Sequence, residues 1–305
     1  MKIKNRYLII LIILLSLIAI KSSPKKTASF NNDEKTKEEK KEPFKINVVN
    51  NKTGEIINLD LENYIIGVVA GEMPASFDVE ALKAQAIASR TYALFKIKNN
   101  KTLTTDISTQ VYITIEDMQN KWKENYNLYY EKIKNAVLET KDLVITYNGD
   151  LISSYYFAMS NGKTEDSKLV FGTDVEYLKS VESNENIETK KTISMSKSDF
   201  CTKLSIDCQD IVIKNEEKTS SGRIQSIVIN NKIFKGTEIR TLLGLRSTDF
   251  NISLDENNII ITTNGYGHGV GMSQYGANAL AKSGYNYEEI LKHYYQNTNI
   301  TKINV

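Results

Sequence analysis

The feature of this sequence that most limits how it can fold is a highly charged stretch near its start. Phe30 is the only strongly apolar residue between positions 22 and 43, and residues 32–42 are almost wholly charged or polar. Such a stretch cannot bury enough apolar surface to offset the entropy that ordering would cost. We therefore expect residues 22–43 to form a disordered linker, which confines folding to residues 44–305.

The residues before this linker form an apolar run with basic flanks. Three basic residues lie within positions 2–6, residues 7–20 are apolar apart from Ser16, and Lys21 follows. A secretory signal peptide starts in the same way but ends in a small-x-small cleavage site, for which residues 16–23 offer no convincing match. A membrane span needs about 17–25 apolar residues, so this run suffices only if the flanking basic side chains reach the interface. We expect an uncleaved signal-anchor at residues 1–21, with a cleaved signal peptide as the alternative; either places the rest of the chain outside the cytoplasm.

The charge balance of the chain narrows its function classes. The 39 basic and 37 acidic side chains leave a net charge of +2. A nucleic-acid-binding protein normally shows a basic excess on one face, so this balance argues against a nucleic-acid partner. It is compatible with a carbohydrate or peptide substrate.

The apolar patterns of residues 44–305 predict an α+β fold. The expected helices are residues 61–71, 79–98, 121–140 and 287–296. The expected extended segments are a hairpin at 44–59, then 104–115, 143–147, 151–157, 177–181, 211–214, 223–229 and 259–262. Asn148 and Gly149 both tolerate positive φ and are typical of a tight hairpin turn. Because strands and helices do not alternate as βαβ units, we expect a mostly antiparallel sheet domain with helices and a long groove.

Two cysteines lie in the part of the chain that is expected to be exported, where disulfides can form. On one unbroken helix, Cys201 and Cys208 would lie about 10 Å apart along the axis, which is too far to bond. A disulfide therefore requires the helix to end between them, which residues 205–207 permit. Two free thiols are an equal alternative.

The first candidate for chemistry is Glu72. It lies in the sequence VVAGEMP (residues 68–74), at the end of an apolar helix that Pro74 forces to stop. A carboxyl group at such a point can be partly desolvated while it faces a cleft. Desolvation raises the pKa of a carboxyl group and keeps a proton available near neutral pH, as a general acid requires. The alternative is a solvated glutamate at a helix end, and residue type alone favours that alternative.

The second predicted helix carries a polar face. Gln85, Ser89 and Tyr92 are spaced i, i+4 and i+7 and share one side of the helix. Lys83 and Arg90 share a nearly opposite side, so the two sets cannot both line one groove. We expect Gln85 and Tyr92 to suit sugar hydroxyls, and Arg90 to be a buried ion-pair anchor.

A glycine-rich motif, GYGHGVGMSQYG, spans residues 265–276 and contains five glycines. Its backbone can approach a ligand closely. His268 lies within it, whereas His293 lies in the last predicted helix. A lone histidine is more often a hydrogen-bonded structural residue than a ligand, so a structural and a substrate-contacting role of His268 both stay open.

Taken together, these motifs resemble the signature blocks of the stage II sporulation protein D family. The long blocks are residues 71–74 (GEMP), 80–86 (EALKAQA), 89–93 (SRTYA) and 267–277 (GHGVGMSQYGA). Weaker blocks are residues 110–112 (QVY), 160–165 (SNGKTE), 240–250 (RTLLGLRSTDF) and 293–295 (HYY). The resemblance covers the chain from about residue 45 to its end.

The resemblance implies a glycan-cleaving domain at residues 44–305 that acts as a lytic transglycosylase in engulfment during endospore formation. Its substrate would be peptidoglycan glycan strands from which a partner amidase, stage II sporulation protein P, has removed the stem peptides. Stage II sporulation protein M would complete the complex. The expected location is the mother-cell membrane, with a single N-terminal anchor and an extracytoplasmic domain facing the septum. No cofactor is implied.

The resemblance also assigns residue roles. The family's catalytic glutamate falls on Glu72. The expected substrate-binding residues are Gln85, Ser89, Tyr92, Gln110, Tyr112, Ser160, Thr164, His268, Gln274 and Tyr275. Lys83 and Arg90 are expected to be structural residues near the site.

Two departures from the family pattern bear on these roles. Residues 158 and 159 are Ala-Met instead of the usual Ser-Thr, and Asn161 replaces a glycine, which puts the substrate contacts of that loop in doubt. Zinc-binding members carry Cys and His just ahead of the Gln-x-Tyr block, where this chain has DIST (residues 106–109). A site built from Cys201, Cys208 and one histidine would lack the close-spaced ligand pairs of zinc sites. We therefore expect no metal site.

A non-enzymatic function is the main alternative. The same domain resembles amidase enhancers of the vegetative cell wall, which bind glycan and stimulate a separate hydrolase. A metal-dependent amidase would need a ligand set, and the only two histidines of the chain lie in different motifs.

Overall fold

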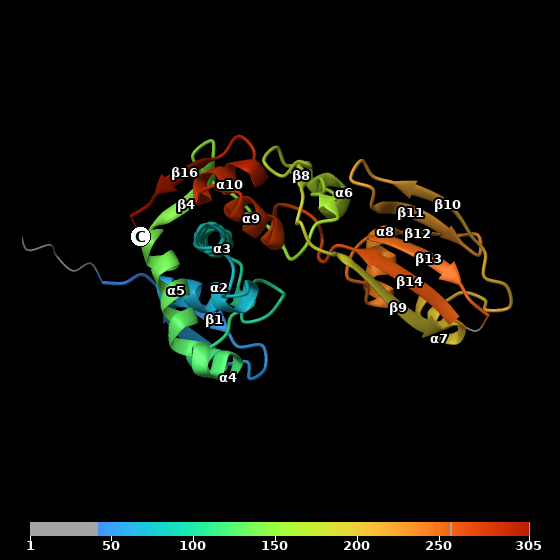
Figure 1. Cartoon of the computed structure of the whole chain (residues 1–305), viewed down its shortest axis with the longest axis horizontal. Helices are drawn as coiled ribbons and strands as arrows, with labels where there is room; N and C mark the ends of the chain where they lie inside the picture. Colours follow the sequence, from blue (N-terminus) through green and yellow to red (C-terminus); the bar gives the residue numbers. More distant parts are fainter. Residues whose placement is uncertain (1–41, 257, 305) are drawn as a thin grey trace, which may run out of the picture. The chain divides into compact units, whose positions relative to one another are not determined.

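The computed structural model describes residues 42–256 and 258–304 (Figure 1). The predicted signal-anchor and residues 22–41 of the predicted linker lie outside the described residues. In the described part of the chain, no helix is both long and apolar enough to cross a membrane. Two hydrophobic cores lie within Pro43–Val305, which is one compact unit.

The first elements follow the prediction. β1 (Lys45–Val49) and β2 (Ile56–Asp60) form the predicted antiparallel hairpin, and β1 also pairs in parallel with β3 (Leu103–Thr104). α2 (Leu61–Glu72) and α3 (Val79–Lys98) match the predicted helices within one residue. Their apolar spacing and the break at the only proline of the folded part were therefore sufficient to locate them.

α3 is the central helix of the first core. It contacts α2, α5 (Tyr126–Glu139), α9 (Gln274–Lys282) and α10 (Tyr287–Tyr294). In Figure 1, α3 is seen nearly end-on with these helices around it. The Asp78 side chain caps its start by accepting a hydrogen bond from the Glu80 amide at 3.0 Å. Small alanine side chains along α3 allow the neighbouring helices to approach closely.

The helix predicted at residues 121–140 is confirmed over most of its length but is divided at its start. The structure has α4 (Ile115–Trp122), the 3-10 turn η1 (Lys123–Asn125) and α5 (Tyr126–Glu139). α4 begins earlier because Thr114 and Asp117 form a capping box. The Thr114 hydroxyl accepts a hydrogen bond from the Asp117 amide at 3.1 Å, and the Asp117 carboxylate accepts one from the Thr114 amide at 2.9 Å.

The predicted turn at Asn148-Gly149 is confirmed, with φ values of 52° and 86°. It joins β4 (Leu143–Tyr147) to β5 (Asp150–Leu151), and β16 (Asn299–Lys302) pairs with the other edge of β4. All these pairings are antiparallel.

The strand predicted at residues 151–157 is divided. After β5, the chain forms β6 (Tyr156–Phe157), which pairs in parallel with β15 (Met272–Ser273) instead of continuing the hairpin. This pairing brings the glycine-rich motif beside Tyr156. The last three residues of that motif are helical, because α9 begins at Gln274 with Ser273 as its N-cap.

The strand predicted at residues 177–181 is wrong, because those residues have no regular structure. The nearby elements are β7 (Gly162–Lys163), α6 (Ser167–Phe171) and β8 (Glu182–Ser183). β7 and β8 pair with each other. The first core is formed by residues 45–183 and 265–304. These residues are called the helical region below.

The second core belongs to residues 190–264, called the sheet region below. Its elements are β9 (Lys190–Ser196), α7 (Lys197–Leu204), β10 (Ile213–Lys218), β11 (Ile224–Ile229), β12 (Lys232–Lys235), α8 (Gly236–Leu243), β13 (Asp249–Leu254) and β14 (Asn258–Asn264). They form two antiparallel sheets, β10-β11-β12 and β13-β14-β9. β9, α7, β12, α8 and β13 were not predicted. The antiparallel α+β class is confirmed.

The two cysteines form a disulfide in the sheet region. α7 ends at Leu204, and Ser205 turns the chain with a φ of 52°. The Cα atoms of Cys201 and Cys208 are consequently 5.6 Å apart and the sulfurs are bonded. The helix thus ends between them, as a bond requires.

Candidate active site

Glu72 is the last residue of α2, and its half-buried side chain is held at both oxygens. The Val111 amide donates a hydrogen bond to Oε1 at 2.7 Å. The Gln274 side-chain amide donates one to Oε2 at 3.3 Å. Three segments that are distant in the sequence therefore meet at this carboxyl group.

Two glycines of α2 allow the segment around Val111 to approach Glu72. A Cβ atom at Gly71 would lie 2.5 Å from the Val111 carbonyl oxygen. A Cβ atom at Gly67 would lie 2.2 Å from the Tyr112 ring. The Ile113 amide donates to the Gly67 carbonyl at 3.2 Å, which ties the segment to the helix. The backbone donor for Glu72 is thus placed by close contact between main chains.

A network of neutral polar side chains extends from Glu72. The amide nitrogen of Gln274 lies 3.5 Å from the Gln85 amide oxygen, and the Gln85 amide nitrogen donates to the Ser89 hydroxyl at 2.9 Å. Gln85 and Ser89 are fully buried. The i, i+4 spacing that the sequence showed on α3 is therefore a direct hydrogen bond.

A second branch of the network is built on Gln110. The Tyr156 hydroxyl donates to the Gln110 amide oxygen at 2.9 Å, and the Gln110 amide nitrogen donates to the Tyr64 hydroxyl at 3.3 Å. A hydrogen bond between the Tyr156 side chain and Glu72 lowers the pKa of that carboxyl group. In the described part of the chain, Glu72 is the one carboxyl group in this network.

Burial raises the pKa of Glu72, and the hydrogen bonds from Val111, Gln274 and Tyr156 oppose that rise only in part. Burial likewise raises the pKa of the phenols of Tyr64, Tyr92 and Tyr156. These phenols therefore remain neutral near neutral pH. An acid in such surroundings can keep a proton that a solvated glutamate would lose.

Several predicted substrate-binding residues pack against other parts of the fold. The Tyr112 ring stacks on Tyr64, with ring centroids 5.6 Å apart. The Tyr275 ring meets Phe77 edge-on at 4.8 Å. The Tyr92 ring is 6.0 Å from that of Tyr155. Each of these rings packs against another aromatic side chain, and their contact with substrate stays a prediction.

The predicted contacts at Ser160 and Thr164 are not brought to Glu72. Both side chains are buried, and their hydroxyls accept hydrogen bonds from the backbone amides of Gly162 at 2.9 Å and Val181 at 2.8 Å. Their loop instead positions Glu165. The SNGKTE block therefore shapes the chain where the two regions meet.

His268 lies among aromatic rings. Its ring centroid is 5.5 Å from Phe171, 5.8 Å from Phe157 and 6.0 Å from Tyr155. Its Nδ1 accepts a hydrogen bond from the Val270 amide at 3.0 Å. Burial, together with the charges of nearby arginines, lowers the pKa of His268 to about 4. The imidazole is therefore neutral. A hydrogen bond to the Tyr156 backbone places it next to the Glu72 network.

Lys83 and Arg90 both form ion pairs. The Lys83 ammonium lies 2.9 Å from Glu80 and 2.8 Å from Glu139. Arg90 is fully buried and its guanidinium contacts both oxygens of Glu62, at 2.9 and 2.6 Å. Arg90 also donates to two backbone carbonyls, so it joins α2, α3, α5 and β4.

Tyr64 and Tyr156 are network residues that the sequence reasoning missed. Tyr64 lies in the apolar pattern of α2 and Tyr156 lies in a predicted strand, so both rings had the spacing of ordinary core residues. Nothing in the local sequence marks their hydroxyls as partners of Gln110. Only the tertiary contacts identify these two hydroxyls as part of the network.

The residues that the structure describes contain no group of three or more His, Cys, Asp or Glu side chains that could hold a metal ion.

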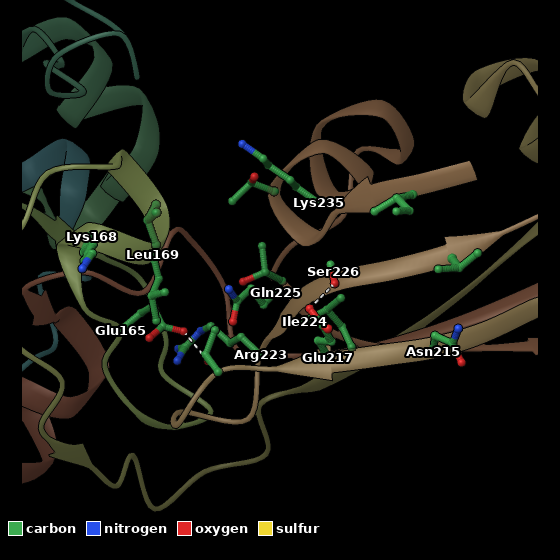
Figure 2. Close-up of a pocket in the computed structure, with 16 residues that line it drawn as sticks. Glu165, Lys168, Leu169, Asn215, Glu217, Arg223, Ile224, Gln225, Ser226 and Lys235 are labelled. Atoms are coloured by element: carbon green, nitrogen blue, oxygen red, sulfur yellow. Dashed lines mark hydrogen bonds between the residues drawn. The ribbon is translucent and has the colours of Figure 1, made fainter. Parts of the chain in front are cut away.

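The structure has a cavity of about 650 Å³ that is not lined by Glu72 or its hydrogen-bond partners (Figure 2). It lies between α6 and the β10-β11-β12 sheet. The residues that frame it in Figure 2 include Glu165, Lys168, Leu169, Arg223 and Lys235. Glu72 does not line this cavity, so the long groove that we expect to pass Glu72 stays a prediction.

Comparison with known proteins places the chain in a family. A family model described as "Stage II sporulation protein" matches residues 49–147. The chain is 38% identical over 276 residues to stage II sporulation protein D of Bacillus subtilis, covering 86% of this chain and 80% of that protein. The same identity and coverage hold for stage II sporulation protein D of Bacillus amyloliquefaciens. An amidase enhancer of B. subtilis is 31% identical over 296 residues, covering 77% of this chain and 40% of that protein. The chain belongs to the stage II sporulation protein D family.

Proposed function

We propose that this protein is a lytic transglycosylase that cleaves the glycan strands of peptidoglycan, with Glu72 as its acid and base. The observation that carries the proposal is a single carboxyl group of raised pKa within a network of neutral polar side chains. Most glycosidases that hydrolyse their substrates use two carboxyl groups. A lytic transglycosylase needs one, because the 6-hydroxyl of the substrate's own muramic acid replaces water.

The reaction has two proton transfers. Glu72 protonates the glycosidic oxygen, and the bond between that oxygen and the anomeric carbon of muramic acid breaks. The 6-hydroxyl oxygen then bonds to the same anomeric carbon and gives its proton to Glu72. The products are a free 4-hydroxyl on the leaving sugar and a 1,6-anhydro-muramic acid end, and Glu72 is protonated again.

The polar network around Glu72 supports this role. The Val111 amide and the Gln274 side chain fix the orientation of the carboxyl group. Gln85, Gln110 and Tyr156 add amide and hydroxyl groups of the kind that bind sugar hydroxyls. We assign substrate contact to this set in preference to Ser160 and Thr164, whose hydroxyls are engaged with the backbone.

The wider setting belongs to the same proposal. Residues 1–21 would anchor the protein in the cell membrane, with the glycan-cleaving domain on the outer side and residues 22–43 as a linker. The substrate would be glycan that the amidase stage II sporulation protein P has stripped of stem peptides during engulfment. Stage II sporulation protein M would be a further partner.

The test is Glu72→Gln. Glutamine keeps the shape and the hydrogen-bond acceptor but cannot transfer a proton, so the fold should persist. A positioned acid and base contributes about 100- to 10,000-fold, and release of anhydro ends from stripped glycan should fall by at least that factor. Glu80→Gln, at an ion-paired glutamate of the next helix, is the control and should stay active. Near wild-type release of anhydro ends by Glu72→Gln would place the acid elsewhere.

A second candidate function is a non-catalytic glycan-binding enhancer of an amidase. The observation in its favour is the similarity to a protein named amidase enhancer. A wild-type protein that binds glycan, makes no anhydro ends and accelerates a separate amidase would support this function instead.

A further inference from the structure

A second carboxyl group, Glu185, is buried outside the Glu72 network. It lies in the loop after β8 and is 6% exposed. Its Oε1 accepts hydrogen bonds from the Ser160 amide at 2.7 Å and from the Ser273 hydroxyl. Its Oε2 is buried and has no hydrogen-bond partner in the described part of the chain. A buried carboxyl oxygen without a hydrogen-bond partner lowers stability, so Glu185 is a candidate for a role beyond packing.

The contact with Ser273 connects Glu185 to α9. The Ser273 hydroxyl donates to Glu185 and accepts from the Gly276 amide at 3.2 Å, which caps the helix. The residue after Ser273 is Gln274, whose amide contacts Glu72. One peptide unit therefore separates the residue that Glu185 holds from the residue that holds Glu72.

The first turn of α9 also has little room to shift. A Cβ atom at Gly276 would lie 2.2 Å from the Tyr294 hydroxyl and 2.5 Å from the Ser183 hydroxyl. Those two hydroxyls lie 2.9 Å apart. Packing thus limits α9 from one side, and the Glu185 contact fixes it from another.

We propose that Glu185 is a positioning residue for Glu72, which acts by fixing Ser273 and the start of α9 so that Gln274 reaches the catalytic carboxyl group. This inference rests on the proposed function. Loss of this positioning should change the pKa of Glu72. Burial raises that pKa, and the hydrogen bond from Gln274 lowers it. If Gln274 moves away, the pKa of Glu72 rises further.

Few other titratable groups face Glu72 or Glu185. The phenols of Tyr64, Tyr92 and Tyr156 face Glu72 and are neutral near neutral pH. Arg223 and Tyr294 are the titratable groups that face Glu185. Burial raises the pKa of Glu185 to about 7, so near neutrality it is partly protonated. Glutamine is therefore a close mimic of its protonated form.

The experiment compares Glu185→Gln with Glu185→Leu on stripped glycan across pH. The glutamine oxygen can accept both hydrogen bonds, so Glu185→Gln should keep near wild-type kcat. Leucine removes the acceptor, and a misplaced catalytic contact should lower kcat by about 10- to 100-fold with little change in KM. The alkaline limb of the rate profile, where Glu72 loses its proton, should move to higher pH in Glu185→Leu. Equal losses in the Gln and Leu variants would overturn the proposal.

A double variant tests the route through Gln274. Gln274→Leu alone should shift the alkaline limb in the same direction. Adding Glu185→Leu to Gln274→Leu should then change the profile little further, because the contact is already gone. Losses that multiply would show that Glu185 acts by another route.

A titration without substrate separates this proposal from the proposed function. The Glu72 carboxyl carbon can be followed by 13C NMR, with assignment by the loss of its signal in Glu72→Gln. A higher pKa of Glu72 in Glu185→Leu supports positioning even if the protein makes no anhydro ends. An unchanged pKa in the folded variant would overturn it. If Glu185→Leu does not fold, Ser273→Ala removes the joining hydroxyl while Glu185 is kept, and it should shift the pKa of Glu72 in the same way.

Discussion

The helical region and the sheet region stabilise their interiors in different ways. The helical region buries polar side chains along α3, with Gln85, Ser89 and Arg90 all fully buried. The sheet region buries a cluster of aliphatic and aromatic side chains together with Cys201 of the disulfide, and its buried Arg223 donates a hydrogen bond to the helical region. The polar interior also contains Glu72 and the other residues of the candidate site. Substitutions there should affect both stability and activity, whereas substitutions in the sheet core should affect stability first.

Polar contacts join the two regions. The Thr219 and Ser221 hydroxyls of the sheet region donate to Glu165 at 2.6 Å each. Arg223 donates to the Lys163 carbonyl at 2.9 Å. The SNGKTE block, which resembled a substrate loop in the sequence, therefore ends in a residue that binds the sheet region.

The largest expected effect is in the helical region. Arg90→Met removes a buried guanidinium and leaves the Glu62 carboxylate without its partner, which should cost about 3–5 kcal/mol of unfolding free energy. The control is Lys98→Met, which removes an exposed ion pair with Asp150 and should cost less than about 1 kcal/mol. Urea denaturation followed by circular dichroism measures both. Equal costs would contradict the comparison.

The next effect is in the sheet region. Replacing Cys201 and Cys208 together by serine releases a short loop, and loop-closure entropy predicts a loss of about 2–3 kcal/mol. The glycan-cleaving activity of the folded variant should be unchanged at temperatures below its unfolding transition. A loss of activity without unfolding would show that the two regions are coupled more tightly than this comparison allows.

A smaller stability effect with a large activity effect is expected at Gly71. Its Cβ atom would press on the Val111 carbonyl at 2.5 Å. Overpacking of this kind costs about 1–3 kcal/mol, and the gain in helix propensity from alanine offsets part of it. Because Val111 must move, Gly71→Ala should also lower kcat. The stability of the variant and its rate of anhydro-end release, measured together, test both statements; full activity would mean that the Val111 contact is dispensable.

The smallest effect is a pH dependence at His268. The pKa of His268 is about 4 in the folded protein, against about 6.5 for an ordinary histidine. A depressed folded-state pKa contributes stability that is present above the unfolded pKa and is lost as pH falls from about 6.5 towards 4. His268→Gln should therefore flatten the stability profile in this window while activity near neutral pH changes little. If activity falls and the profile is unchanged, His268 contacts substrate.

The sequence predicted local structure well where a periodic pattern was closed by a clear stop. β1, β2, α2 and α3 are examples, each with apolar spacing that ends at a turn or at Pro74. The prediction failed at α4, where the capping box of Thr114 and Asp117 was overlooked. It also failed for several strands of the sheet region, whose short and partly exposed segments alternate weakly.

The site was predictable only in part for a similar reason. Glu72, Gln85 and Gln274 lie in recognisable motifs. Their mutual contacts join residues up to 202 positions apart in the chain. The Tyr64 and Tyr156 hydroxyls each meet Gln110 across 46 positions, and neither lies in a motif. Contacts between residues so far apart in the sequence depend on the tertiary fold, and no local sequence pattern indicates them.

The most direct test of the central claim is the fate of solvent oxygen during cleavage. Stripped glycan is digested by the wild-type protein in water enriched in 18O, and the new ends are analysed by mass spectrometry, with a hydrolytic muramidase as the control. In a lytic transglycosylase the 6-hydroxyl replaces water, so we predict 1,6-anhydro ends that carry no 18O, and their absence from the Glu72→Gln digest. Reducing ends that carry one 18O atom, or anhydro ends that persist in Glu72→Gln, would contradict the claim.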